Sequence, residues 1–156
     1  MNDELIPNEG ERIAAIPQLC VSNHLRRTSR AVSSFYDEIL RSTGLHGNQI
    51  VMLVVPYRLG PVSINKMAER LGLDRTTLVR NLKLIEARGL VTIKAGKDLR
   101  TRMVTLTPKG HETLAAAVPL WEEAQKQVIE LLGSYYTELM NSLATLSVLE
   151  RGPDSD

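Results

Sequence analysis

The segment from Ile64 to Val91 constrains the fold most, because it contains two helical periodicities separated by a very short break. In its first part, INKMAERL, apolar residues recur at the three- and four-residue spacing that places them on one face of a helix. Gly72 ends this pattern, and Asp74 can cap the next helix by accepting from its free backbone N–H groups. The apolar arc of that second helix consists of Leu78, Leu82 and Ile85. With Gly89 placed to end it, the segment predicts a helix-turn-helix.

Two runs rich in β-branched residues follow this segment directly. They are LVTIKA and RMVTLT, and the polar stretch GKDLR lies between them. Such runs around a polar turn predict a β-hairpin. A helix-turn-helix with an appended hairpin is a winged helix, so we expect a mainly α fold with a small β-hairpin wing.

Helical spacing also dominates the flanking segments. In RTSRAVSSFYDEIL the apolar positions are Val32, Phe35, Tyr36, Ile39 and Leu40, and we expect this helix to begin near Ile16. The run NQIVMLVVPYRL also fits a buried strand, although we favour a helix. Thr107 and Pro108 can open a long helix, in which Pro119 should produce a kink. A last helix should follow Gly133.

Charge is distributed unevenly along the 156 residues, although the net charge is only +1. Residues 66–109 carry eleven Lys or Arg and four Asp or Glu, whereas residues 110–156 carry two and eight. A basic centre beside an acidic C-terminal third is typical of a protein with one face that meets an anion.

The second predicted helix has a basic face opposite its apolar arc. We place Thr76, Val79, Arg80 and Lys83 on it, flanked by Arg75 and Thr77. Taken alone, such a face is usually just solvated. Its position after a tight turn and before a basic hairpin favours a helix that reads the major groove of DNA, where Arg pairs with guanine and Lys reaches phosphate.

The hairpin tip and the start of the first helix add further polar candidates. The tip carries Lys94, Lys97, Arg100 and Arg102, which suit the minor groove or phosphate. We expect Asp98 to orient an arginine or the turn backbone, because a carboxylate that faced phosphate would be repelled. Ser63, Asn65 and Lys66 are candidate phosphate contacts, although capping is the favoured role of Ser63.

These stretches resemble the MarR family of transcriptional regulators. INKMAERLGLDRTTLVRNLKLIEARGLV resembles its paired helices, KDLRTRMVTLTPKG its wing signature, and LRRTSRAVSSFYDEIL its first helix. The resemblance implies a homodimer on a pseudo-palindromic double-stranded DNA site, with Thr76, Thr77, Arg80 and Lys83 in the major groove. It also implies Arg100 in the minor groove, supported by Asp98, and repression that a ligand or oxidant relieves.

The resemblance also divides the chain. We expect a polar tail at residues 1–12, a helical dimerisation region at 13–43 and 111–150, a winged helix-turn-helix at 48–110, and a polar tail at 151–156. The apolar stripes of the outer helices agree with this division, since they would be exposed without a partner. An apolar crevice between the two regions could hold a small-molecule effector.

Cys20 corresponds loosely to the peroxide-sensing cysteine of one branch of the family. A sensing role and a simple packing role both remain open, because thiol reactivity depends on pKa and access. His24, His46 and His111 are too far apart in the chain to suggest a metal site, and we expect no cofactor.

Other classes of function have less support. The sequence offers no glycine-rich phosphate loop and no recognisable catalytic constellation, so we do not expect an enzyme. A winged helix that binds another protein through the same basic face is the alternative. The N-terminus lacks the pattern of a secretory signal and no run suits a bilayer, so we expect a cytoplasmic protein.

Overall fold

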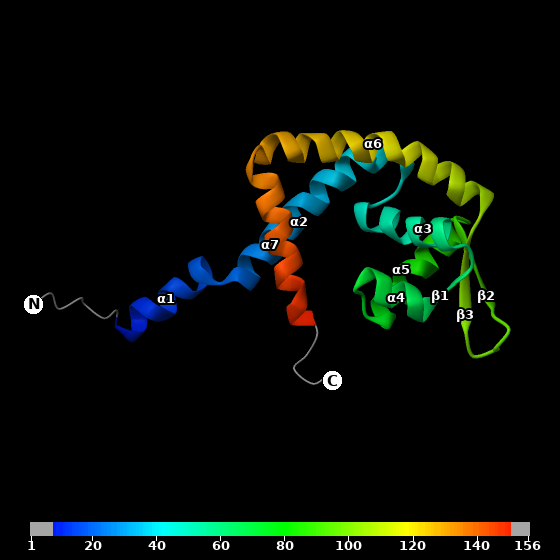
Figure 1. The fold of residues 1–156 in the computed structure, drawn as a ribbon, viewed down its shortest axis with the longest axis horizontal. Helices are drawn as coiled ribbons and strands as arrows, with labels where there is room; N and C mark the ends of the chain where they lie inside the picture. The colour runs from blue at the N-terminus through cyan, green and yellow to red at the C-terminus, as the bar shows by residue number, and fades with distance from the viewer. Residues whose placement is uncertain (1–7, 151–156) are drawn as a thin grey trace, which may run out of the picture.

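The structure is a computed structural model that describes residues 8–150 and shows a mostly helical chain with one small sheet at one end (Figure 1). Its helices are α1 (Glu9–Leu19), α2 (Val21–Leu40), α3 (Gly47–Leu59), α4 (Ile64–Leu71), α5 (Arg75–Ala87), α6 (Pro108–Leu132) and α7 (Tyr135–Leu146). Its strands are β1 (Val62–Ser63), β2 (Val91–Ala95) and β3 (Arg102–Leu106), and short 3-10 turns occupy Arg41–Thr43 and Ser147–Glu150. The predicted winged helix is confirmed, and the ambiguous run before Gly60 is a helix.

The sheet contains one strand that the sequence analysis missed. Its order is β1-β3-β2, and both pairings are antiparallel. β1 is only two residues long, so it has no period-two pattern that could reveal it. Ser63 pairs with Met103, which places the start of α4 beside the start of β3, just after the wing loop.

One core holds α3, α4, α5 and the sheet together. Its centre includes Leu53, Met67, Leu78, Leu82, Ile85 and Val104, whose exposed fraction is 0%. α3 contacts α2, α4 and α6 as well as β3, so it needs apolar residues around most of its circumference. This explains why its sequence looked like that of a buried strand.

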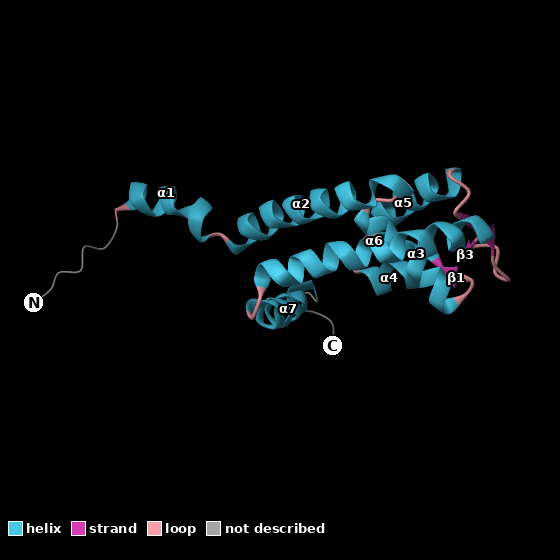
Figure 2. Ribbon diagram, turned by 90° about the horizontal axis from the view of Figure 1, so that it is seen from above, coloured by secondary structure: helices cyan, strands magenta, loops and turns pink. Residues whose placement is uncertain are grey.

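Helices α2, α6 and α7 extend beyond this core (Figures 1 and 2). α6 begins as predicted, because the Thr107 hydroxyl accepts a hydrogen bond from the Gly110 N–H at 2.9 Å. It is one continuous helix through Pro119. The kink expected at this position stays a prediction. Tyr36 of α2 donates to Gln125 Oε1 of α6 at 2.6 Å, and Gln125 Nε2 donates to Tyr136 Oη of α7 at 3.1 Å.

The N-terminal helix differs from its prediction. It begins at Glu9 rather than near Ile16, because Asn8 and Glu11 form a capping box that starts a helix upstream. The chain then turns at Cys20, where Asn23 Nδ2 and the His24 ring bind the carbonyls of Pro17 and Gln18, so α1 and α2 are separate helices. No residue of α1 is buried, and Figures 1 and 2 show it extending away from the core. The predicted tails at 1–7 and 151–156 lie outside the described residues.

Candidate nucleic-acid interface

Helix α5 starts as its sequence predicts. Gly72 adopts the left-handed conformation, with φ of 58°, and reverses the chain after α4. Asp74 then accepts a hydrogen bond from the Thr77 N–H at 2.8 Å. The hydrogen bonds from Thr77 hold the pKa of Asp74 below its usual range, so the cap is a carboxylate at neutral pH.

The two faces of α5 are distinct, with one correction. Leu78, Leu82 and Ile85 are buried, whereas Arg75, Thr76, Arg80 and Lys83 are exposed on the other side. Val79 was predicted to lie on the exposed basic face, but it is half-buried and packs against the core. α5 contacts α3, α4 and β2, so its buried arc is wider than the packing of one neighbouring helix would require. Thr77 is also half-buried.

The other end of α5 is fixed by residues that the sequence analysis did not single out. Glu86 Oε1 accepts from the Ile93 N–H at 2.8 Å and so ties α5 to β2. Arg88 donates to the carbonyls of Gly44 at 2.5 Å and Thr43 at 3.2 Å, which ties α5 to the turn between α2 and α3. These bonds set the direction of the exposed basic face.

The start of α4, the start of α5 and the end of the wing loop, where it enters β3, meet at a small hollow. Ser63 caps α4, because its hydroxyl accepts from the Lys66 N–H at 3.2 Å, as predicted. The Arg75 guanidinium donates to the Asn65 side chain, which joins α5 to α4. The hollow is lined by Ser63, Ile64, Asn65, Arg75, Arg100, Thr101 and Arg102. Separate parts of the sequence therefore converge on one basic depression.

The wing tip is ordered by Asp98, as predicted. Its carboxylate accepts from the Arg100 N–H at 3.0 Å, and its carbonyl accepts from the Thr101 N–H at 2.9 Å. The remaining predicted contacts are all exposed: Lys66, Lys94, Lys97, Arg100 and Arg102. Within residues 8–150, none of the ion pairs involves a basic residue of α4, α5 or the wing. These cations are free to meet an anion.

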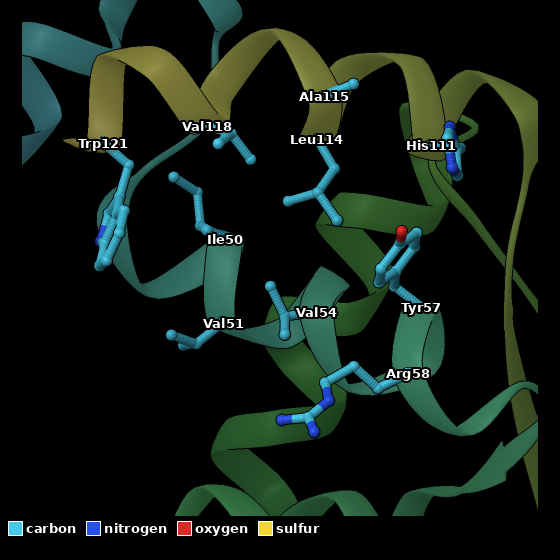
Figure 3. Close-up of a pocket in the computed structure, with 10 residues that line it drawn as sticks. All are labelled: Ile50, Val51, Val54, Tyr57, Arg58, His111, Leu114, Ala115, Val118 and Trp121. Atoms are coloured by element: carbon cyan, nitrogen blue, oxygen red, sulfur yellow. The ribbon is translucent and has the colours of Figure 1, made fainter.

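An apolar crevice lies between α3 and α6, where the sequence analysis expected one (Figure 3). Its volume is about 780 Å³, and Ile50, Val54, Leu114 and Val118 line its middle. Trp121 stands at one end, and the Tyr57–His111 ring pair, 5.4 Å apart, stands at the other. The crevice therefore joins the winged helix to the long helix α6.

Cys20, for which sensing and packing were both open, lies at the turn between α1 and α2. It is half-buried, and its thiol makes no hydrogen bond within the part of the chain that the structure describes. Its role as a sensor stays a prediction. Among residues 8–150, no three His, Cys, Asp or Glu side chains form a cluster that could hold a metal ion. None of the helices described has the length and apolar character needed to cross a membrane.

Known proteins resemble this chain in sequence. Residues 43–100 match the MarR family. An organic hydroperoxide resistance transcriptional regulator of Bacillus subtilis is 32% identical over 94 residues, 60% of this chain. The chain spans 66% and 63% of the lengths of two curated Bacillus subtilis relatives, slightly less than two thirds.

Solved structures extend the match to most of the chain. The transcriptional regulator MosR of M. tuberculosis, solved in complex with DNA, is 35% identical with a TM-score of 0.77, covering 83% of this chain and 95% of that one. The repressor CouR, bound to a 23-mer DNA duplex, is 26% identical with a TM-score of 0.76, covering 86% of this chain and 96% of that one. The winged helix, its basic face and these matches together show that the chain belongs to the MarR family of DNA-binding transcriptional regulators.

Proposed function

We propose that the protein is a homodimeric, sequence-specific repressor of transcription. The observation that carries this proposal is the basic face shared by α5, the start of α4 and the wing, whose cations have no ion-pair partner among residues 8–150. The alternative, a winged helix that binds a protein, is less favoured because similar structures hold DNA. The proposed role is regulatory rather than enzymatic, and it places the protein in the cytoplasm with the DNA it controls.

The residues of this face have distinct proposed roles. Helix α5 enters the major groove, where Arg80 can pair with guanine, Thr76 and Thr77 can meet bases, and Lys83 can reach phosphate. Arg100 enters the adjacent minor groove with the wing, and Asp98 holds the tip in shape. Lys66, Arg75, Lys94, Lys97 and Arg102 are proposed to contact phosphate. Asn65 supports Arg75 through their hydrogen bond, and Ser63 caps α4.

The dimer is proposed from apolar surface on the outer helices. Leu19, Val32, Trp121, Leu139 and Leu143 are at least 38% exposed, and an isolated protomer would leave them in water. A second copy packed on α1, α2, α6 and α7 would bury them. Two copies of α5 would then read half-sites about one helical turn apart, on the order of 34 Å.

The crevice between α3 and α6 is the proposed effector site. It is mostly apolar, and Arg58, His111 and Tyr57 supply polar groups along its lining. A ligand there would contact both the winged helix and α6, so it could change the direction of α5 relative to the dimer. Oxidation at Cys20 is a separate proposed signal, supported by the peroxide-linked name of the relative from Bacillus subtilis.

The test compares two double variants on an operator duplex that the wild-type protein selects from a random pool. We expect Arg80→Ala/Arg100→Ala to lower affinity by roughly a hundredfold or more, because each of these arginines should contribute about 1–3 kcal/mol to DNA binding. The matched control is Arg41→Ala/Lys126→Ala, which also removes two exposed cations but lies outside the basic face. Both variants should remain dimeric. Unchanged affinity in Arg80→Ala/Arg100→Ala would refute these residue assignments.

A further inference from the structure

The hollow between α4, α5 and the wing contains three arginines with no acidic group among its lining residues. Arg75, Arg100 and Arg102 line it together with Ser63, Asn65 and Thr101. None of these arginines takes part in an ion pair within residues 8–150. Three arginines in the lining of one depression bring like charges near one another, and a bound anion would reduce their repulsion. The hollow therefore has the composition of an anion site.

The fold itself builds this arrangement. The pairing of Ser63 with Met103 places Thr101 and Arg102 beside the first turn of α4. The hydrogen bond from the Arg75 guanidinium to the Asn65 side chain holds Arg75 at the same place from α5. That bond occupies one arm of the guanidinium, and its other N–H groups stay available for a ligand.

The geometry of a DNA duplex indicates which anion would lie at the hollow. In the proposed function, α5 lies in the major groove and the wing lies in the adjoining minor groove. One sugar–phosphate strand separates two adjoining grooves, so it must cross between the start of α5 and the wing. The hollow lies at that crossing.

We infer that this hollow binds a single phosphate of the DNA backbone, held jointly by Arg75 of α5 and Arg102 of the wing. The inference rests on the proposed function and adds the shared phosphate to it. Arg100 lies two residues nearer the wing tip and keeps its proposed place in the minor groove. Asn65 is a positioning residue, because it acts through Arg75. One phosphate then fixes the spacing between the major-groove helix and the minor-groove wing.

A shared phosphate has a distinctive salt signature. The logarithm of the binding constant falls with the logarithm of salt concentration by about 0.9 per phosphate neutralised. Arg75→Gln alone should lower affinity roughly tenfold but leave the slope nearly unchanged, since Arg102 still neutralises the phosphate. Arg102→Gln should behave in the same way. The double variant should lose more than the roughly hundredfold product of the two single losses, because only this variant leaves the phosphate unneutralised, and its slope should fall by about 0.9.

The control pair is Lys83→Gln/Lys97→Gln, whose residues lie on α5 and the wing but outside the hollow. Two independent phosphate contacts should give additive losses and a slope reduced by about 1.8. The positioning role of Asn65 is tested with Asn65→Ala, which should lower affinity several-fold in the wild-type background and have no effect in Arg75→Gln. Thermal unfolding of each variant should match that of wild type.

The measurement is fluorescence anisotropy with the selected operator duplex across a salt series. Coupled losses and a slope change of about 0.9 in Arg75→Gln/Arg102→Gln are the expected result. Additive losses with a slope change of about 1.8 would overturn the shared phosphate and leave the proposed DNA binding intact. A wild-type protein that selects no duplex would overturn the proposed function, and this inference with it.

Discussion

The winged helix and the outer helices differ in how completely one protomer buries them. In α4, α5 and β3, residues such as Met67, Leu82 and Val104 are fully buried by their own chain. In α1 and α7 no residue is buried, and Leu19 is 77% exposed. The first region is therefore complete within one protomer, whereas the second presents an apolar surface that remains to be covered.

This difference suggests that the two regions have different roles. The complete region holds the basic face in a fixed shape through caps and side-chain bonds such as Glu86 with the Ile93 N–H. The incomplete region would determine the distance between two such faces, because a partner copy would pack there. Under this account, changes in the outer helices alter assembly, and changes in the winged helix alter folding or DNA contact.

The largest expected effect is on assembly. Leu139→Glu/Leu143→Glu would place two charges on the exposed apolar stripe of α7, and burying them in a dimer interface would be strongly unfavourable. We expect the dimer dissociation constant to rise by roughly a hundredfold or more. Sedimentation velocity should show a helical monomer. Leu84→Glu is the control, because Leu84 is 57% exposed on α5 and should leave the dimer unchanged.

The next effect tests the packing of the complete region. A Cβ at Gly110 would lie 2.0 Å from the Leu90 carbonyl oxygen, which cannot easily move because it accepts from the Thr107 N–H at 3.1 Å. Gly110→Ala should therefore lower the free energy of unfolding by about 3 kcal/mol. Gly133→Ala should cost less, about 1–2 kcal/mol, since its φ of 54° and ψ of −127° are strained for alanine but nothing lies within 4 Å.

Urea unfolding at one fixed protein concentration compares the two glycine variants, because the stability of a dimer depends on concentration. An equal loss in both variants would contradict the close approach of α6 to the Leu90 carbonyl, which lies between α5 and β2.

The smallest effect concerns the hydrogen bonds that join the outer helices α2, α6 and α7 to one another. Tyr36→Phe removes the hydrogen bond to Gln125 and should cost about 1 kcal/mol. Burial, and then the neighbouring Tyr136, raise the pKa of Tyr36 above its ordinary value of 10.0. Stability contributed by neutral Tyr36 should therefore be complete below pH 10.0 and decline as the pH rises through the raised pKa. Tyr136 of α7 completes this chain of hydrogen bonds, because its hydroxyl accepts from Gln125 Nε2.

The pH dependence separates Tyr36 from an exposed tyrosine. Unfolding measured between neutral and alkaline pH should show a shallower alkaline decline in Tyr36→Phe than in wild type. Tyr135→Phe is the control, since Tyr135 is 70% exposed, and it should keep the wild-type profile. If stability depends on pH in the same way in all three proteins, the ionisation of Tyr36 does not contribute to stability.

Local signals explain what the sequence could predict. The caps at Ser63, Asp74 and Thr107 each satisfy a free N–H of the first turn, and each depends only on neighbouring residues. The same is true of Gly72 and of the hairpin, because turn chemistry and β-branched runs act locally. These elements were confirmed, and with them the side of α5 that carries Arg80 and Lys83.

Contacts between distant segments explain what the sequence could not predict. β1 is defined by its pairing with β3 rather than by its own two residues. Val79 was misplaced because its burial depends on how several elements surround α5. The hollow depends on Asn65, Arg75 and Arg102 meeting across three elements. The early start at Glu9 was different, since Asn8 and Glu11 gave a local signal that was overlooked.

The central claim is that two copies of the basic face read a DNA sequence. Its most direct test is binding of the purified wild-type protein to the DNA upstream of its own coding region, with random duplex as competitor and salt varied. We expect a dimer bound to one site, resistant to random competitor, with affinity that falls by orders of magnitude from low to moderate salt. Binding that random DNA removes equally well at every salt concentration would contradict the claim.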